Sequence, residues 1–342
     1  MNSKGGRISY FLRLKIFSVQ PLRKLLYIAN NRRSTYLKRF SCVATSEDKK
    51  LMMKYLWKYG LSYEDFYFFD VKENDPATFI SECYRWKYYK KLNTKKGSKV
   101  YADKGETYKV FSDLYGRDLV TVYSKRDYDE FLKHNPGFVY KDSINGCGKG
   151  IKLYKTGETD KEELWENLKN RVPFIMEQPI VQSEEMARFH PESVNTVRIV
   201  TVLKGNDKTG YTVEAFAPFM KVGKGNSFVD NGGAGGIMCS VGMDGTITSD
   251  GIDELVNIYM EHPDTHIVFK GQKLPEFEKA IIVAKTAALR YTENRLVGWD
   301  VAHSMEKGWI IVEGNSFGQF IGQQMCDKIG KKQEFEEIIS EI

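Results

Sequence analysis

The stretch 308–316 constrains the fold of this 342-residue chain more than any other. Four apolar residues, 309–312, lead directly into Glu313 and Asn315, with one glycine between these two. The apolar run is short, β-branched and aromatic, which predicts a buried strand. Because side chains two positions apart on a strand point to the same face, Glu313 and Asn315 should lie side by side. A carboxylate and an amide oxygen placed in this way suit Mg²⁺.

A second short apolar stretch, 296–301, carries a single acid, Asp300. A tight turn at 305–308 would pair the two strands as a hairpin and bring Asp300 beside Glu313. Three oxygen ligands on one small sheet then form a cradle for the metal ions of a nucleotide. The other interpretation is a strand that ends in an exposed acid, and these residues alone leave both interpretations open.

The excess of positive charge in the chain lies at its start. The net charge is +6, and residues 1–40 contain ten Lys or Arg but no Asp or Glu, which leaves 41 basic and 45 acidic groups in the rest. The segment is either a basic helical pair packed on the body or a contact with an anionic membrane surface or another polyanion. It also matches an organellar transit peptide. Arg13 and Lys15 interrupt the apolar core that a secretory signal needs.

The five cysteines are scattered and show no CxxC spacing, so they suggest neither a disulfide framework nor a zinc site. No apolar run approaches the length that spans a bilayer. We therefore expect a cytoplasmic protein, and residues 1–40 leave open a peripheral position at the inner face of the membrane.

A lysine and a glycine-rich loop indicate phosphate binding. The predicted strand 138–141 ends at Lys141 and passes into the loop 142–151, in which Gly146, Gly148 and Gly150 alternate with other residues. Glycine lets backbone N–H groups surround an anion, and lysine supplies a mobile positive charge. The loop has neither the Gly-Lys-Ser/Thr of a P-loop nor the spacing of a dinucleotide fingerprint. The alternative is a tight hairpin.

The predicted strand 172–181 passes into a connector at Pro179, which has no N–H. The carbonyl of Gln178 and the amide of Ile180 can offer one acceptor and one donor to the edge of a planar base. Glu184 and Glu185 follow, and either can take a pair of ribose hydroxyls.

Periodicity and capping signals predict the remaining elements. Residues 195–202 alternate polar and apolar side chains and should form a hairpin with 211–221. Helices are expected, with Ser46 as the N-cap of the first, at 46–63, 75–91, 104–114, 161–170, 276–290 and 333–342.

The loop 223–236 is rich in glycine and amide side chains. Long loops inside compact domains are usually functional or disordered, so this loop suits a mobile cover over a ligand. The alternative is a long surface loop.

Together these parts resemble the ATP-grasp superfamily, and most closely its sugar-transfer-associated group, with weaker similarity to glutamate-ligase-like and D-alanine–D-alanine ligase members. The resemblance covers roughly residues 100–325. The loop 226–236 points to the sugar-transfer group in particular. The remaining parts that carry the resemblance are, in order, Asp103-Lys104, Lys141 with its glycine loop, 176–180, 195–198, Asp300 and Glu313-Gly314-Asn315.

The resemblance implies an α+β fold in which two lobes hold ATP between them. We expect a basic, mostly helical N-terminal region at 1–95, a small ATP-grasp lobe at 96–175 and a large lobe at 176–342. It also implies that Asn226, Ser227 and Asn231 contact the substrate.

The resemblance assigns the phosphate and metal contacts. Lys104 and Lys141 would contact the α- and β-phosphates, and the glycines of 146–150 would close over them. Mg²⁺ would be carried by Asp300, Glu313 and Asn315.

The adenosine contacts are implied in the same way. Gln178 and Ile180 would hold adenine through their backbone, with Glu177 near its amino group. Glu184 is the first candidate for the ribose and Glu185 the second.

One position departs from the pattern of the related ligases, which often place an arginine two residues before the first metal aspartate. Here that position is Gly298. Charge stabilisation at the transferring phosphoryl must then come from elsewhere. Arg198 is the first candidate, and Arg188 and Lys221 are the others.

The chemistry implied is carboxylate activation through an acylphosphate, followed by attack of an amine. It needs no nucleophilic residue, because phosphoryl transfer depends on positioning and charge stabilisation. The five histidines lack metal-ligand spacing, and His303 is expected in a turn, in solvent.

The first hypothesis is therefore an ATP-dependent ligase that forms a C–N bond. It would join an amino acid or amine to a sugar acid in surface polysaccharide or capsule biosynthesis, and nucleic acid is not expected as a partner. The alternatives are a kinase-like phosphotransferase that acts on a sugar or small metabolite, and a non-catalytic nucleotide-binding protein.

Overall fold

The computed structural model describes residues 44–143, 150–155, 157, 160–318 and 321–342. The chain forms two compact units. Of the described residues, the first unit comprises 44–92 together with 328–336, and the second comprises those within 93–327 and 337–342. The basic segment 1–40 lies outside the described residues, so its membrane contact stays a prediction.

Aromatic side chains hold the first unit together. Phe69 stacks on Phe79 with ring centroids 4.5 Å apart, and Tyr88 packs edge-on against Phe335 at 5.0 Å. The helices of this unit are α4 (Ser46–Tyr59), α5 (Tyr63–Phe68), α6 (Glu82–Leu92) and the first half of α14 (Lys332–Ser340).

Helix α4 begins at a capping box. The side chain of Thr45 accepts the N–H of Asp48, and the carboxylate of Asp48 accepts the N–H of Thr45. The expectation that Ser46 is the N-cap is therefore wrong by one position. The helix ends at Gly60, whose φ of +69° suits glycine, and so it stops before the predicted end at residue 63.

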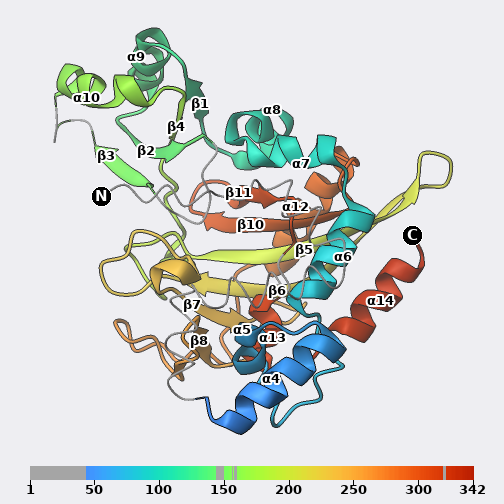
Figure 1. Cartoon of the computed structure of the whole chain (residues 1–342). Coiled ribbons are helices and arrows are strands. Elements are labelled where there is room, and N and C mark those ends of the chain that lie inside the picture. Colours follow the sequence, from blue (N-terminus) through green and yellow to red (C-terminus); the bar gives the residue numbers. More distant parts are fainter. Residues whose placement is uncertain (1–43, 144–149, 156, 158–159, 319–320) are drawn as a thin grey trace, which may run out of the picture. The chain divides into compact units, whose positions relative to one another are not determined.

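The second unit holds an antiparallel sheet of four strands in the order β1-β4-β2-β3 (Figure 1). Helices α9 and α10 pack on it through a core that includes Tyr128, Phe138, Leu168 and Phe174. The elements are β1 (Leu119–Val122), α9 (Lys125–His134), β2 (Gly137–Asp142), β3 (Lys152–Lys155), α10 (Lys161–Leu168) and β4 (Phe174–Glu177). Strand β4 extends across the predicted lobe boundary between residues 175 and 176.

The same unit holds a sheet of seven antiparallel strands in the order β11-β10-β5-β6-β7-β8-β9. Helix α12 (Phe277–Arg290) packs on it through Ala280, Ala284 and Ala287, whose small side chains let the helix lie close to the strands. The strands are β5 (Thr196–Asn206), β6 (Gly210–Val222), β7 (Ile237–Ser240), β8 (Gly251–Asp253), β9 (Ile258–Tyr259), β10 (Leu296–Ser304) and β11 (Gly308–Asn315).

Four further helices complete the second unit. Helix α8 contributes Phe111 to the same core, where its ring lies edge-on to Trp299 at 5.2 Å. The helices are α7 (Lys95–Ala102), α8 (Lys104–Tyr115), α11 (Glu184–Ala187) and α13 (Ile321–Asp327). Single 3₁₀ turns lie at Lys169–Arg171 and Gly232–Ala234.

Both predicted hairpins are confirmed. Strands β5 and β6 pair from Thr196 opposite Lys221 to Asn206 opposite Gly210, which is longer than the sequence pattern indicated. Strands β10 and β11 pair across the turn at 305–307, and Asp300 lies opposite Glu313.

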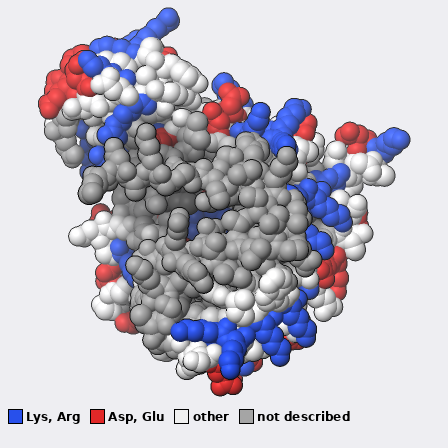
Figure 2. Space-filling model, viewed as in Figure 1, with Lys and Arg blue, Asp and Glu red and all other residues white. Residues whose placement is uncertain are grey.

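Charge is mixed on the surface. Lys or Arg and Asp or Glu side chains are both scattered over the described part of the face shown in Figure 2, as the near balance of charge after residue 40 leads one to expect. Among the described residues, no helix combines the length and the apolar character that crossing a bilayer requires.

Candidate active site

The hairpin of β10 and β11 brings the three predicted metal ligands together. Asp300 lies opposite Glu313, Gly298 lies opposite Asn315, and the Nδ2 of Asn315 donates to the Oδ2 of Asp300 at 3.5 Å. The register shifts immediately after Asp300, where Val312 is the extra residue on β11. Such a bulge re-aims the neighbouring side chains, here that of Glu313.

Two cations, one from β5 and one from β6, contact Asp300. The Nε and Nη2 of Arg198 donate to its two carboxylate oxygens at 2.6 and 2.9 Å, and the Nζ of Lys221 lies 3.1 Å from Oδ1. Burial alone would raise the pKa of Asp300, but these two cations outweigh it and lower the pKa to about 2. The carboxylate is therefore ionised at any physiological pH.

The side chain of Arg198, from the adjacent strand β5, lies against Gly298, the position that lacks the expected arginine. A Cβ at Gly298 would lie 3.1 Å from the Cδ of Arg198 and 3.3 Å from the Cα of Gly318. Both distances are tighter than ordinary van der Waals contact. The bare backbone of Gly298 thus provides the room in which the Arg198 side chain lies.

The third candidate for charge stabilisation, Arg188, makes local contacts instead. It is exposed at the end of α11, donates from Nε to the carbonyl of Glu185 at 3.1 Å and lies over the ring of Phe189. Of the three predicted candidates, Arg198 and Lys221 are the two that the structure brings to Asp300.

The two predicted phosphate lysines line one pocket, and Glu313 lies in the same lining. Lys104 is the first residue of α8, and burial lowers its pKa while the charge of Glu313 opposes that effect. Lys141, near the end of β2, forms an ion pair with Glu177 of the adjacent strand β4. The pocket is lined by Tyr101, Lys104, Thr107, Tyr115, Leu119, Lys141, Glu177, Val312 and Glu313.

A second cation, Arg117, contacts Glu177 as well. Its Nε donates to the Oε1 of Glu177 at 2.6 Å, and its Nη2 also bonds to that oxygen. Burial would raise the pKa of Glu177, but Arg117 and Lys141 outweigh it, so the pKa lies below its usual range. Sequence reasoning missed Arg117 because it belongs to no recognised motif.

The connector after β4 is fixed at both ends. The N–H of Gln178 donates to the carbonyl of Asp118 at 2.9 Å, while its side-chain oxygen accepts the N–H of Asp118 at 3.3 Å. Beyond the half-buried Ile180, the N–H of Ser183 donates to the carbonyl of His303 at 2.9 Å. Glu184 follows, exposed at the start of α11.

Of the predicted phosphate loop, residues 144–149 lie outside the described residues, and Gly146 and Gly148 are among them. Gly150 has a φ of +79°, and a Cβ there would lie 3.3 Å from the Oδ2 of Asp142. This backbone conformation favours glycine. The role of the loop in phosphate binding stays a prediction.

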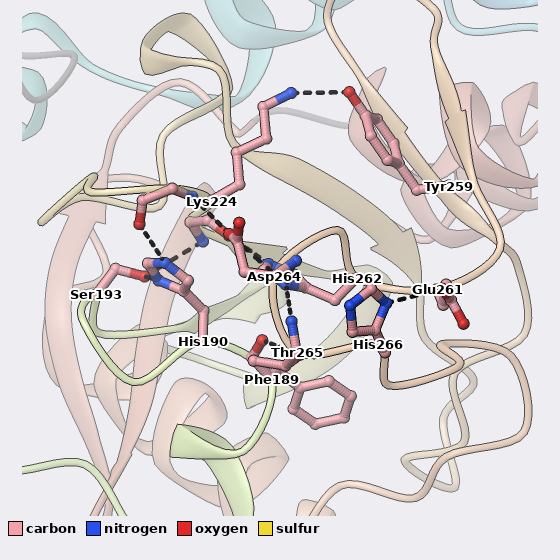
Figure 3. A network of polar contacts seen from close by, with 12 residues as sticks. Phe189, His190, Ser193, Lys224, Tyr259, Glu261, His262, Asp264, Thr265 and His266 are labelled. Carbon is pink, nitrogen blue, oxygen red and sulfur yellow. Dashed lines mark hydrogen bonds and ion pairs between the residues drawn. The ribbon is translucent and has the colours of Figure 1, made fainter.

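The loop 223–236 begins in a network of hydrogen bonds (Figure 3). The Nδ1 of His262 accepts the N–H groups of Asp264 and Thr265 at 3.2 and 3.3 Å, so its Nε2 carries the hydrogen that the Gly223 carbonyl accepts at 2.8 Å. The Nε2 of His190 bonds to the carbonyl of Gly225 at 2.9 Å. The first three residues of the loop are therefore anchored, which limits any mobile cover to the residues after them.

A buried acid holds the middle of this loop. The Oδ2 of Asp230 accepts the N–H and the hydroxyl of Thr196 at 3.0 and 2.5 Å, and its Oδ1 lies 3.9 Å from the Nζ of Lys221. Burial raises the pKa of Asp230, although Lys221 opposes the shift. Lys221 thus lies between Asp230 of the loop and Asp300 of β10.

The three residues predicted to contact substrate lie in the same loop. Asn226 is exposed, whereas the hydroxyl of Ser227 donates to the carbonyl of Val229 at 2.6 Å and so supports the loop itself. The carbonyl of Asn231 accepts the N–H of Gly236 at 3.1 Å. Their contact with substrate stays a prediction.

The expectation for His303 is wrong. His303 does not lie in a turn in solvent: it belongs to β10, only 8% of it is exposed, and its ring packs edge-on against Trp309 at 5.2 Å. Neither ring nitrogen has a hydrogen-bond partner among the described residues. Burial lowers the pKa of His303.

Among the described residues, no cluster of three or more His, Cys, Asp or Glu side chains could hold a metal ion. The set Asp300, Glu313 and Asn315 is not such a cluster, because it contains only two carboxylates and its third member is an amide. Carboxylate and amide oxygens on one face of paired strands are of the kind that suits Mg²⁺. In this structure both oxygens of Asp300 accept from Arg198, and Asn315 turns its amide nitrogen toward Asp300.

Comparison with known proteins gives similarities in sequence and in structure. The family model described as "Sugar-transfer associated ATP-grasp" matches residues 84–339. No curated protein matches this chain.

Three solved structures illustrate the similarity. One is the ATP-grasp ligase PsnB complexed with a minimal precursor, with 11% identity over 73% of this chain and 64% of that chain, at a TM-score of 0.45. The second is N5-carboxyaminoimidazole synthase from Aspergillus clavatus in complex with ADP and 5-aminoimidazole ribonucleotide, with 12% identity over 66% of this chain and 47% of that chain, at a TM-score of 0.38. The third is L-amino acid ligase from Bacillus licheniformis, with 13% identity over 68% of this chain and 44% of that chain, at a TM-score of 0.39. This chain spans less than two thirds of the length of each.

Proposed function

The chain belongs to the sugar-transfer-associated ATP-grasp family, and from this premise we propose that it is an ATP-dependent carboxylate–amine ligase. The observation that supports the proposal best is one pocket whose lining includes Lys104, Lys141 and Glu313. Asp300 lies opposite Glu313 and is held by Arg198. Phosphoryl transfer needs this combination of cations for phosphate and acids for its metal ion.

In the proposal, Lys104 and Lys141 bind the phosphates of ATP, and Asp300, Glu313 and Asn315 hold Mg²⁺. The bound Mg²⁺ would neutralise phosphate charge, and a structure of PsnB that contains Mg and ADP supports this expectation by analogy. Gln178 and Ile180 face the adenine, and Glu184 the ribose.

Arg198 and Lys221 supply the remaining positive charge. Both are buried beside Asp300 on adjacent strands. Preorganised cations of this kind stabilise charge that develops on a transferring phosphoryl group without a further cost of reorganisation. Arg198 thereby takes the place of the arginine that is missing at position 298.

The proposed reaction has two steps. A carboxylate oxygen of the substrate attacks the γ-phosphorus of ATP, the bond to the β-phosphate oxygen breaks, and ADP leaves behind an acylphosphate. An amine nitrogen then attacks the acyl carbon, the carbon–oxygen bond to phosphate breaks, and an amide, inorganic phosphate and a proton are formed. Neither step requires a nucleophilic side chain of the protein, because positioning and charge stabilisation suffice.

The family description mentions sugar transfer but names no substrate, and we propose a sugar acid, joined to an amino acid or amine, as the substrate class. We propose that the reaction serves the synthesis of a surface polysaccharide. The loop 223–236, anchored beside Lys221 through Asp230, is the part of the chain proposed to contact this substrate.

A two-dimensional screen tests the proposal. ADP release is measured with a panel of uronic acids and amino acids as carboxylates, crossed with a panel of amines, in the presence of ATP and Mg²⁺. The ligase predicts ADP release that requires one carboxylate together with one amine, and an amide product by mass spectrometry. ADP release with a hydroxyl acceptor alone would favour the phosphotransferase instead. ATP binding without ADP release under any condition would favour a non-catalytic protein.

A further inference from the structure

Arg117 lies beside the nucleotide pocket but has no role in the reaction proposed above. From its contacts we infer that Arg117 is a positioning residue: it is a permanent counter-ion of Glu177, and it thereby lets Lys141 leave Glu177 for the phosphate of the nucleotide. The inference rests on the proposed function, in which Lys141 binds phosphate.

Two cations share one buried carboxylate. Arg117 bonds to the Oε1 of Glu177 through Nε and Nη2, whereas Lys141 forms an ion pair with Oε2. The side chains of Arg117 and Glu177 are each only 3% exposed, and that of Lys141 is 16% exposed. Water therefore cannot readily replace a cation that leaves Glu177.

Arg117 is fixed by contacts that do not involve the nucleotide. Its Nη1 donates to the carbonyls of Tyr115 and Ile311 at 2.8 and 2.7 Å, and its Nη2 also donates to the carbonyl of Val312 at 3.4 Å. The guanidinium further lies over the ring of Tyr115, 4.9 Å from its centroid. A planar guanidinium with several fixed acceptors cannot follow a ligand.

Lys141 differs in each of these respects. Its ammonium ends a flexible stem of four carbons, and it lines the same pocket as Lys104 and Glu313. Among the described residues, it forms an ion pair with Glu177. Of the two cations on Glu177, Lys141 is the one that can move to a phosphate in that pocket.

The energetic consequence follows from burial. A buried carboxylate that loses its only cation is strongly destabilised. With Lys141 as its only cation, Glu177 would compete with the nucleotide for that lysine. Because Arg117 stays on Oε1, Glu177 keeps a counter-ion when Lys141 leaves, and the nucleotide gains the lysine at a smaller cost.

Titration of two ligands tests this inference. A non-hydrolysable ATP analogue uses Lys141, whereas adenosine carries no phosphate and does not. We expect Arg117→Met to weaken binding of the ATP analogue by at least about tenfold relative to adenosine, as measured by isothermal titration. Adenosine serves as the internal reference for any change in the adenine site. In the double variant Arg117→Met/Glu177→Gln, the ratio of the affinities for the ATP analogue and adenosine should return to the wild-type value, because Glu177 then no longer holds Lys141.

Two further variants show whether the effect of Arg117→Met on nucleotide affinity depends on Lys141. In Lys141→Met, the additional change Arg117→Met should leave the ratio of the two affinities unchanged. Arg290→Met is the control, because Arg290 forms an exposed two-point pair with Asp113 of α8 and lines no part of the pocket. It should leave the ratio at the wild-type value. If Arg117→Met does not fold, Arg117→Lys takes its place with a smaller loss in the same direction.

The outcomes separate the inference from the proposed function. Failure of the wild-type chain to bind the ATP analogue, or an unchanged ratio in Lys141→Met, overturns the phosphate site itself. If Lys141→Met lowers the ratio but Arg117→Met lowers both affinities equally, Arg117 is merely structural and the inference is wrong. The inference is also wrong if Glu177→Gln fails to restore the ratio in the Arg117→Met background.

Discussion

Arg198 and Asp300, 102 residues apart in the chain, form an ion pair at two points, with nitrogen–oxygen distances of 2.6 and 2.9 Å. The pair joins β5 to β10, whose register places the two residues opposite each other. Asp300 lies opposite Glu313 on its other side. One row of side chains across three strands therefore contains two of the proposed metal ligands, Asp300 and Glu313, and the proposed stabiliser of phosphoryl charge, Arg198.

The acids of this row should be essential for turnover. Asp300→Asn or Glu313→Gln removes one of two carboxylates from the proposed Mg²⁺ site, and we expect turnover to fall by at least ~10²-fold, the scale of one lost preorganised electrostatic contact. Binding of ATP in the presence of EDTA should survive. Glu306→Gln, at an exposed position of the same hairpin, is the matched control and should behave as wild type. Near-normal turnover in both acid variants would show that Asp300 and Glu313 do not hold a Mg²⁺ ion needed for the reaction.

The arginine of the row can be tested by a conservative change. Arg198→Lys retains the charge but not the planar fork that bonds both oxygens of Asp300, so turnover should fall about tenfold or more. Gly298→Ala should lower turnover less, because its Cβ would displace Arg198 by only a few tenths of an ångström. Steady-state kinetics with saturating ATP measure both effects. A larger loss in Arg188→Lys than in Arg198→Lys would move the assignment to Arg188.

Asp230 should control the order of the loop 223–236. In Asp230→Asn, a single amide replaces a carboxylate that accepts two hydrogen bonds from Thr196 and faces Lys221. We expect faster amide hydrogen exchange in the loop and lower turnover, with little change in ATP affinity. Asp207→Asn, at the exposed tip of the β5–β6 hairpin, is the control. Unchanged exchange in the loop of Asp230→Asn would show that Asp230 does not hold it.

Two buried histidines should make the fold sensitive to acid. Burial lowers the pKa of both His262 and His303, so the unfolded chain binds protons more readily than the folded one. Their contribution to stability is complete above the unfolded pKa of about 6.5 and is lost as the pH falls from there through their folded pKa values.

His303 allows this linkage to be isolated. His303→Phe keeps an aromatic ring against Trp309 and removes two ring nitrogens that lack partners among the described residues. The variant should be at least as stable as wild type at pH 7. Its melting temperature should also fall less between pH 7 and pH 5. Thermal unfolding of both proteins measures this difference. An equal fall in melting temperature between pH 7 and pH 5 in the two proteins would exclude a contribution from His303.

The sequence predicted the parts of the site that depend on local pairing. Asp300 and Glu313 lie on strands joined by a short turn, so apolar runs and one turn sufficed to place them together. The approach of Arg198 and Lys221 to Asp300 depends on the pairing of β5 with β10 and with β6. Motif order favoured Arg198 but did not separate Lys221 from Arg188.

Arg117 and His303 show why other features of the site could not be predicted from the sequence. Two partners of Arg117, Glu177 and Ile311, lie 60 and 194 residues away, and neither its neighbours nor its spacing marks it in the sequence. His303 was placed in solvent because the predicted strand ended at residue 301, whereas β10 continues to Ser304. The end of a strand decides here whether a polar side chain is buried.

Isotope transfer tests the central claim, ligation through an acylphosphate, most directly. The carboxylate identified by the screen is labelled with ¹⁸O and incubated with ATP, Mg²⁺ and the matching amine, and the released phosphate is analysed by mass spectrometry. The account predicts one ¹⁸O atom in the phosphate for each amide formed, because the carboxylate oxygen stays with phosphorus when the amine displaces it. Formation of ADP without ¹⁸O in the phosphate would contradict it.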